Sequence, residues 1–214
     1  MDNFEKYLIL VNENNEFDSS MIEDFKMVTV KDSDGKTYME EETFKAYQAL
    51  QKLMNKKHGI ALSLTSAGRT VEIQQKVYEE IKKQQGEKAA DDLVATPGKS
   101  EHHTGLALDV GVHKIHLPIE QKIYNSQLLT RATAKLIKPT KHERAEMYEK
   151  LHAELAEFGF VVRYPEGKQS ITKIKRPEPW HIRYVGVKAA KEMSELDMCL
   201  EEYITYLKNK EVSV

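Results

Sequence analysis

Apolar side chains recur every three or four residues along three stretches of the chain, the spacing of helices with one buried face. These stretches cover residues 40–56, 143–158 and 187–208. A fourth helix is predicted over 71–85, after Thr70, which can cap it. Gly159 should end the helix that precedes it. In the last helix, Leu196 is expected to face inward.

Shorter segments are predicted to be extended. Residues 25–30 alternate between polar and apolar side chains and lead into a turn-rich cluster, which indicates a strand followed by a loop. Further strands are expected at 60–66, 106–111, 160–163 and 180–184, and 8–11 is a strand or an extended arm. In an antiparallel sheet, the strand at 106–111 would carry Asp109 inward together with Ala107.

Two connections are predicted to be irregular. Residues 86–99 link the second helix to the next strand, with a turn at Pro97-Gly98. Residues 112–142 show no clear period, so they are interpreted as an insertion and a possible lid. The chain is otherwise expected to form one domain over residues 1–214, and the basic run at 135–141 to be a solvated loop.

Composition fits an ordinary globular chain. Of its 214 residues, 40% are hydrophobic and 31% charged, and the net charge of -2 argues against a nucleic-acid partner. No apolar run is long enough to span a bilayer. The first residues lack the pattern of a signal peptide, which favours the cytoplasm, or the extracellular side if an anchor has been removed. Cys199 is expected to be a buried small hydrophobe.

Candidate chemistry is concentrated in two short segments. His102 and Asp109 lie in Ser-Glu-His-His-Thr-Gly-Leu-Ala-Leu-Asp, and His181 ends Glu-Pro-Trp-His. Two imidazoles and one carboxylate form a ligand set for a catalytic zinc with one coordination position left for water. Glu178 precedes the last histidine by three residues, so a tight turn could hold its carboxylate beside that water as a general base.

Other zinc patterns fit less well. A helical His-Glu-x-x-His motif would need a histidine at position 146, but His142-Glu143-Arg144-Ala145-Glu146 ends in glutamate. Isolated histidines are more often surface or core residues than ligands. His103 adjoins a ligand and is expected to face the substrate pocket or to lie in a layer behind the metal.

These segments resemble the VanY-type D-alanyl-D-alanine carboxypeptidases. Residues 100–109 match Ser-x-His-x-x-Gly-x-Ala-x-Asp at every fixed position, and 178–181 match Glu-x-x-His. Residues 159–168 resemble the segment that leads to the last ligand, and the likeness spans about 7–187. It implies an α+β fold with a central, mostly antiparallel sheet, helices on one face and a zinc cleft on the other, and one Zn²⁺ per chain.

The resemblance also assigns substrate-binding positions. Arg69 occupies the family's arginine position and Gln74 its downstream glutamine; the guanidinium could clamp a carboxylate or stabilise charge on the carbonyl oxygen. Ser100 is expected to hydrogen-bond the substrate, with a structural turn hydroxyl as the alternative. Gly68 replaces the family's tyrosine and Ala67 its glycine, which changes the expected shape of the stem-peptide pocket.

The implied activity is removal of a terminal D-alanine from peptidoglycan precursors or stem peptides, by a zinc D,D-carboxypeptidase or D,D-dipeptidase. Two enzymatic alternatives remain open at this point: an L,D-carboxypeptidase acting on tetrapeptide stems and a phage-type stem endopeptidase. The non-enzymatic alternative is a zinc-stabilised binding domain, because Hedgehog signalling domains resemble this fold. Glu178 argues against the last alternative, since a binding domain needs no general base.

Overall fold

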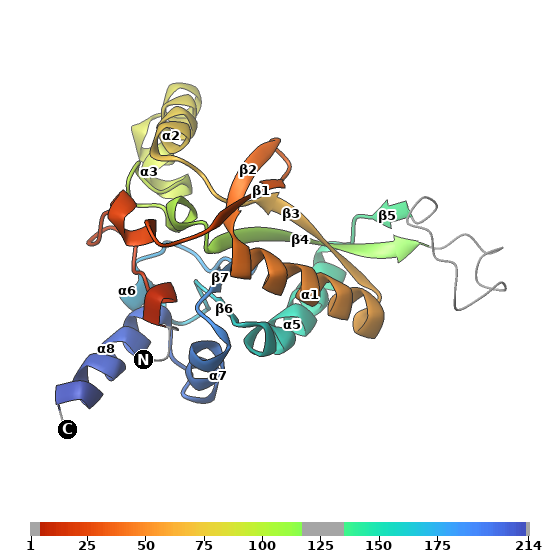
Figure 1. Ribbon diagram of the computed structural model, residues 1–214. Helices are drawn as coiled ribbons and strands as arrows, with labels where there is room; N and C mark the ends of the chain where they lie inside the picture. The colour runs from red at the N-terminus through yellow and green to blue at the C-terminus, as the bar shows by residue number, and fades with distance from the viewer. Residues whose placement is uncertain (1–4, 117–134, 213–214) are drawn as a thin grey trace.

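The computed structural model describes residues 5–116 and 135–212 (Figure 1). Its α-helices are α1 (Glu41–His58), α2 (Val71–Gln85), α3 (Glu87–Leu93), α5 (Lys141–Leu155), α6 (Gln169–Thr172), α7 (Val187–Glu195) and α8 (Leu200–Val212). Its strands are β1 (Met27–Lys31), β2 (Lys36–Glu40), β3 (Ile60–Ser66), β4 (Ala107–His116), β5 (Lys135–Ile137), β6 (Phe160–Val162) and β7 (His181–Tyr184). Short 3₁₀ turns are η1 (Glu5–Tyr7), η2 (Ser19–Ile22), η3 (Glu101–Thr104) and η4 (Ala156–Phe158).

An antiparallel sheet in the order β3-β4-β7-β6 forms the centre of the molecule, and β5 pairs with the far end of β4. The start of β4 pairs with β7, so that Ala107 lies opposite Arg183 and Asp109 opposite His181. Because side chains alternate along a strand, Leu108, Val110 and Val112 point to the other face. These three are buried in the main core.

Helices α1 and α5 cover that apolar face (Figure 1). Buried side chains from both helices pack there against the sheet; they include Leu50 and Met54 of α1 and Leu151 and Leu155 of α5. Thr140 and Glu143 form a reciprocal cap at the start of α5, and Gly159 takes a left-handed conformation after η4. The opposite face is therefore free to carry polar chemistry, and the expected α+β architecture is confirmed.

The structure adds two elements that the pattern did not predict. Residues 36–40, for which no strand was predicted, pair with β1 as strand β2. The connection at 86–99 contains helix α3, which follows Gly86 and is tied to α2 by a 2.6 Å hydrogen bond from the Tyr78 hydroxyl to Asp91. Residues 8–11 form an extended arm instead of a strand of the sheet.

The final helix is not continuous, which corrects the prediction over 187–208. It breaks between α7 and α8, where Asp197 has a φ of 50° and its carbonyl accepts a hydrogen bond from Lys168. The Glu202 carboxylate accepts the backbone N–H of Cys199 and so caps α8. Leu196 consequently ends α7 and is 43% exposed, whereas Cys199 is buried as expected. None of the helices in the described ranges is long and apolar enough to cross a membrane.

The expected insertion at 112–142 is partly regular. Strand β4 continues to His116, β5 pairs with it, and α5 begins at Lys141. The basic run at 135–141 thus contributes a short strand as well as a loop. The centre of the proposed lid, residues 117–134, lies outside the described residues.

Candidate metal centre and active site

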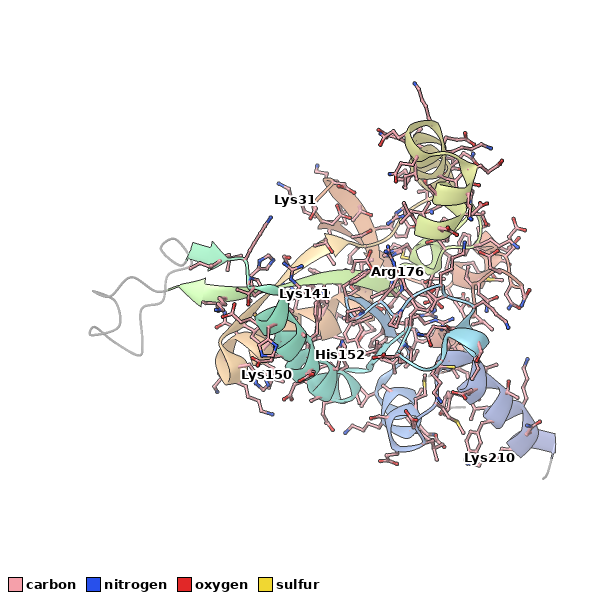
Figure 2. The ribbon with its side chains drawn as sticks, turned by 180° about the vertical axis from the view of Figure 1, so that it is seen from behind. Lys31, Lys141, Lys150, His152, Arg176 and Lys210 are labelled. Carbon is pink, nitrogen blue, oxygen red and sulfur yellow. The ribbon has the colours of Figure 1, made fainter. Side chains whose placement is uncertain are left out.

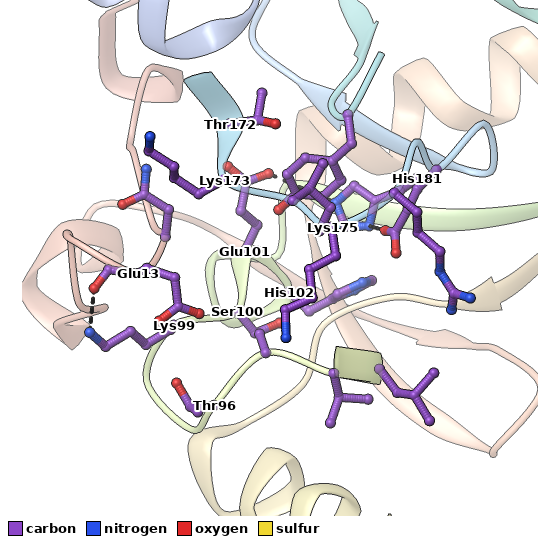
Figure 3. Close-up of a pocket in the computed structure, with 18 of the residues that line it drawn as sticks. Glu13, Thr96, Lys99, Ser100, Glu101, His102, Thr172, Lys173, Lys175 and His181 are labelled. Atoms are coloured by element: carbon purple, nitrogen blue, oxygen red, sulfur yellow. Dashed lines mark hydrogen bonds and ion pairs between the residues drawn. The ribbon is translucent and has the colours of Figure 1, made fainter. Parts of the chain in front are cut away.

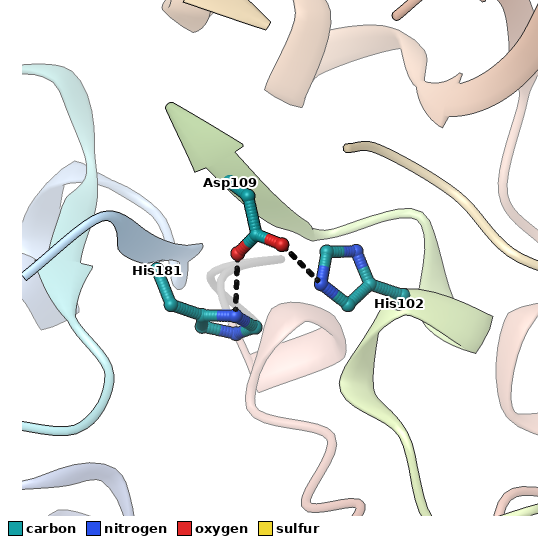
Figure 4. Close-up of side chains that lie close together, drawn as sticks. All are labelled: His102, Asp109 and His181. Carbon is teal, nitrogen blue, oxygen red and sulfur yellow. Dashed lines mark hydrogen bonds and ion pairs between the residues drawn. The ribbon is translucent and has the colours of Figure 1, made fainter. Parts of the chain in front are cut away.

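The three predicted ligands converge on the polar face of the sheet (Figure 4). Asp109 and His181 are directly opposite each other in the β4–β7 pair, so their side chains emerge side by side. Asp109 Oδ1 lies 3.0 Å from His181 Nδ1, and Asp109 Oδ2 lies 3.4 Å from His102 Nε2. One ligand atom from each residue falls within 4.8 Å of the others. The sequence prediction that these side chains meet is borne out in the geometry.

The donor set fits a zinc ion. His102 Nδ1 donates to the Ala67 carbonyl at 2.6 Å, which leaves its Nε2 lone pair directed toward Asp109. Burial opposes ionisation of Asp109, but the adjacent His102 and His181 hold the pKa of this carboxyl well below its usual range. A charged carboxylate and two imidazole nitrogens are ordinary ligands of a catalytic zinc.

Glu178 stands beside this cluster. The carbonyl of Glu178 accepts the backbone N–H of His181 at 3.1 Å, which is the tight turn that the Glu-x-x-His spacing predicted. The Oε2 atom of Glu178 lies 4.0 Å from His181 Nδ1, the ring nitrogen that also faces Asp109. Burial raises the pKa of the Glu178 carboxyl. A carboxylate with these properties is suited to accept a proton from a water molecule at the metal.

The cluster opens into a cleft of about 510 Å³. Figure 3 shows His181 and Glu13 toward opposite ends of it, with Ser100 between them. Lys99 donates to the Glu13 carbonyl and so connects the cleft wall to the N-terminal segment that follows the extended arm. A volume of about 510 Å³ is within the range of sites that bind small ligands.

Lys175 spans one side of the cleft. Its ammonium group forms an ion pair with Asp92 of α3 and donates to the Asp91 carbonyl at 2.9 Å. This contact joins α3 to the segment between α6 and β7. Arg176 follows on the same segment and is exposed (Figure 2), so it places a positive charge at the cleft edge.

Arg69 and Gln74 act as one unit at the cleft wall. Arg69 donates to the Gln74 amide oxygen at 2.7 Å and to the Ser66 hydroxyl at 2.9 Å. Gln74 in turn donates to the Ala95 carbonyl at 2.6 Å, so both ends of its amide are occupied. This geometry makes Gln74 a support for Arg69; Gln74 also lines the cleft, and its direct contact with the substrate stays a prediction. Ser100 lines the cleft and is mostly buried, so its hydrogen bond to a substrate stays a prediction.

His103 lies behind the cleft wall, which corrects its prediction as a substrate contact. Its Nδ1 donates to the Arg69 carbonyl at 2.6 Å, and its Nε2 accepts the backbone N–H of Gly98 at 3.2 Å. Burial lowers the pKa of this imidazole, which matches a neutral ring with one donor and one acceptor. Its position fits the alternative of a layer behind the metal ligands, where it fixes the backbone of Arg69.

Gly68 is accounted for by close packing against β2. A Cβ atom at this position would lie 2.5 Å from two ring atoms and from the carbonyl oxygen of Tyr38. The Tyr38 hydroxyl donates to the His103 carbonyl at 3.1 Å, so its ring is fixed over the glycine. The Tyr38 ring thus occupies the space next to position 68.

Gly68→Ala is expected to lower the free energy of unfolding by about 1–3 kcal/mol, because the added methyl group overpacks a site closed by backbone as well as by a ring. Urea unfolding of the two proteins measures the difference. In a Tyr38→Ala background the same substitution should cost less, since the ring contact is gone. Equal costs in both backgrounds would contradict this packing account.

Two residues at the site were missed by the sequence analysis. Glu101 is fully buried beneath His181, and the Tyr164 ring lies against the His181 ring with centroids 5.0 Å apart. Arg163 and Arg183, whose side chains are 0% exposed, both contact Glu101. The sequence feature that could have revealed Glu101 is the presence of two arginines beside or within apolar strand segments. A buried positive charge requires a buried negative partner.

The mixed fold, with a His₂Asp cluster and an adjacent glutamate in a peptide-sized cleft, defines the class of a zinc metallopeptidase domain. A family model described as VanY, D-alanyl-D-alanine carboxypeptidase, matches residues 36–187. The chain belongs to this family.

Individual relatives agree with this assignment. The chain is 32% identical over 200 residues to the bifunctional D-Ala-D-Ala dipeptidase and D-Ala-D-Ala carboxypeptidase VanXYC of Enterococcus gallinarum, covering 94% of both chains. It is 34% identical over 153 residues to the putative carboxypeptidase YodJ of Bacillus subtilis, covering 72% of this chain and 49% of YodJ. It therefore spans only about half the length of YodJ.

A solved structure extends the likeness to the metal. The vancomycin resistance D,D-pentapeptidase VanY from a VanB-type cassette, crystallised as a mutant in complex with Zn(II), superposes with a TM-score of 0.67 at 29% identity. The match covers 93% of this chain and 99% of that one. Zinc is therefore the metal that both the family and the donor set indicate.

Proposed function

We propose that this chain is a zinc-dependent D,D-carboxypeptidase or dipeptidase, which removes a terminal D-alanine from peptidoglycan precursors or stem peptides. The observation that supports it most directly is the convergence of His102, Asp109 and His181, with the Glu178 carboxylate 4.0 Å from His181 Nδ1. The named activities of VanXYC agree with this substrate class.

In the proposed reaction, zinc and the protein side chains have different roles. Zinc, when bound by His102, Asp109 and His181, supplies a Lewis acid that acidifies water and polarises the scissile carbonyl. Glu178 accepts a proton from the attacking water and delivers it to the departing amine, for which its buried position beside the ligands is suited. The amide bond to the terminal residue breaks, and the carboxyl and amino products leave through the cleft.

Arg69 holds the substrate terminus in this proposal. Contacts with Gln74 and Ser66 use one N–H on each terminal nitrogen of the guanidinium, so three of its five N–H groups have no side-chain acceptor among the described residues and can bind a ligand. A planar guanidinium can bind a carboxylate through two parallel hydrogen bonds. Because Gln74 fixes the orientation of that plane, Arg69 can distinguish a free C-terminus from a blocked one.

The test is a panel of substrates given to the zinc-loaded protein: D-Ala-D-Ala, a pentapeptide stem, a tetrapeptide stem and whole sacculi, with products identified by mass. Release of D-alanine from the dipeptide or pentapeptide is expected. Cleavage of the tetrapeptide alone would identify an L,D-carboxypeptidase, and internal cleavage of sacculi an endopeptidase. Zinc binding without any cleavage would leave only a zinc-stabilised binding domain.

Amidation of the C-terminus should lower kcat/KM for the preferred peptide by at least about tenfold. The blocked terminus loses a charge-assisted pair whose hydrogen bonds are worth about 1.5–3 kcal/mol each, and a tenfold loss corresponds to about 1.4 kcal/mol. Arg69→Lys should reproduce most of this loss on the free peptide, because an ammonium group cannot present the planar fork. Equal cleavage of free and amidated peptides would favour the endopeptidase, with Arg69 acting on the carbonyl oxygen.

A further inference from the structure

Two buried polar atoms in the described part of the chain have no hydrogen-bond partner, and they face each other. They are Oε2 of Glu101 and Nε2 of His181, 3.8 Å apart. The side chain of Glu101 is 0% exposed and that of His181 is 6% exposed. An unpaired buried donor or acceptor is costly, so a facing pair of this kind calls for a physical explanation.

The orientation of Glu101 is fixed by two arginines. Its other oxygen, Oε1, accepts Nε of Arg163 at 2.7 Å and Nη1 of Arg183 at 3.0 Å. Two guanidinium groups on one oxygen form charge-assisted hydrogen bonds that stabilise the carboxylate form of Glu101. Oε1 is therefore saturated with donors, and the charged Oε2 is left to face His181.

The two arginines are themselves anchored. Arg163 makes two further hydrogen bonds to Glu201 of α8, at 2.9 and 2.6 Å. Arg183 donates to the carbonyls of Tyr7 and Ile9 in the N-terminal arm, each at 2.8 Å. The charges of the two arginines balance those of Glu101 and Glu201, so the cluster is a neutral, tightly hydrogen-bonded support. Only Oε2 of Glu101 has no hydrogen-bond donor within it.

His181 presents its two ring nitrogens to different partners. Nδ1 faces Asp109 and Glu178, at the position where a metal would bind, whereas Nε2 faces Glu101. Strand β7 places His181 and Arg183 two residues apart, on the same face of the sheet, so Glu101 lies under both. An imidazole that coordinates a metal through one nitrogen carries its proton on the other, and that N–H needs an acceptor.

We propose that Glu101 is the positioning residue for the ligand His181, accepting the Nε2–H so that Nδ1 is the nitrogen presented to zinc. A shift of less than about 1 Å would bring the two atoms to ordinary hydrogen-bond distance and satisfy both. This inference rests on the ligand set in the proposed function. It adds a residue that sets zinc affinity through the ligand His181, without itself contacting the metal.

Glu101→Gln tests the inference through zinc affinity, measured by competition with a chromophoric chelator. The amide keeps the shape of the carboxylate, but it must either turn its NH₂ group toward His181 or turn it toward the arginines. A loss of about 10- to 100-fold in zinc affinity is expected. Wild-type affinity in a folded Glu101→Gln protein would overturn the inference.

Glu201→Gln is the matched control, because it removes the same charge from the same cluster but touches Arg163 and not His181. Its zinc affinity should stay within about threefold of wild type, well short of the loss expected when an outer hydrogen-bond partner of a ligand is removed. Equal losses in both variants would assign the effect to general weakening of the cluster and would contradict a specific role for Glu101. Thermal unfolding of both proteins without zinc reports that weakening directly.

Nitrogen-15 NMR of the histidines in zinc-loaded wild-type protein gives a second test, which does not depend on a variant that folds. His181 should show metal-bound Nδ1 and a protonated Nε2 whose proton is shifted downfield and exchanges slowly. Metal on Nε2, or a rapidly exchanging Nε2 proton, would overturn the inference. If His181→Ala kept its zinc, the ligand set itself would fail; if that variant lost zinc but Glu101→Gln did not, only this inference would fail.

Discussion

Replacing Glu178 with glutamine is expected to lower kcat by at least about 10²-fold while zinc content and fold stay intact. The amide has the size of the carboxylate but cannot accept a proton, and the carboxylate it replaces lies 4.0 Å from the ligand atom of His181. Turnover on the best peptide of the panel, together with zinc analysis and circular dichroism, measures the effect. Undiminished turnover would move the general base to another group.

The matched control for this change is Glu166→Gln. Glu166 is an exposed glutamate on the segment between β6 and α6, so the control removes the same charge by the same substitution outside the cleft. Its kcat should match wild type, since surface substitutions away from special features have small effects. A comparable loss in both variants would point to net charge instead of proton transfer.

His181→Ala should remove stoichiometric zinc and leave the protein substantially folded. Two ligands remain in that variant, which is one fewer than the three protein ligands usual for a catalytic zinc. The core formed by the sheet with α1 and α5 does not depend on the metal, unlike that of a small zinc finger. Elemental analysis of purified protein, alongside circular dichroism, checks both halves of the expectation.

His142→Ala provides the comparison for zinc loss. Its imidazole is 87% exposed near the start of α5 and pairs only with Glu146 in the described structure, so its removal should leave zinc content unchanged. Full zinc occupancy in His181→Ala would refute the ligand assignment. Loss of zinc in both variants would show that the loss is not specific to the predicted ligand.

Local patterns predicted what depends on neighbours in the chain. Strand β3 and helix α2 have the expected bounds, and the alternation correctly placed Asp109 on the same face of β4 as Ala107, although the main core lies on the other face, with Leu108, Val110 and Val112. The fixed spacings identified the three residues that meet at the cluster, because a short turn and a strand pair determine where those side chains lie. The element bounds and the alternation need no knowledge of distant contacts, whereas the meeting of Asp109 and His181, 72 residues apart in the chain, was predicted from the residue types and spacings of the two motifs.

Features that depend on distant contacts escaped prediction. The break before α8 interrupts an amphipathic pattern that continues through it, and it is stabilised by Lys168, which lies 29 residues earlier in the chain. The environment of Glu101 is similar, since its partner Arg163 is 62 residues away and Arg183 is 82 residues away. For His103 the sequence left two positions open, because adjacency to a ligand does not say which way a ring turns.

The carbonyls of Tyr7 and Ile9 and the Glu201 carboxylate complete the hydrogen bonding of the two buried arginines. All three lie outside residues 36–187, the part of the chain that the family model matches. The boundaries of the shared family segment and of the cooperative folding unit are therefore different. An expression fragment trimmed to the shared segment would expose the guanidinium groups of Arg163 and Arg183 without their counterparts, and a usable minimal domain has to keep both ends of the chain.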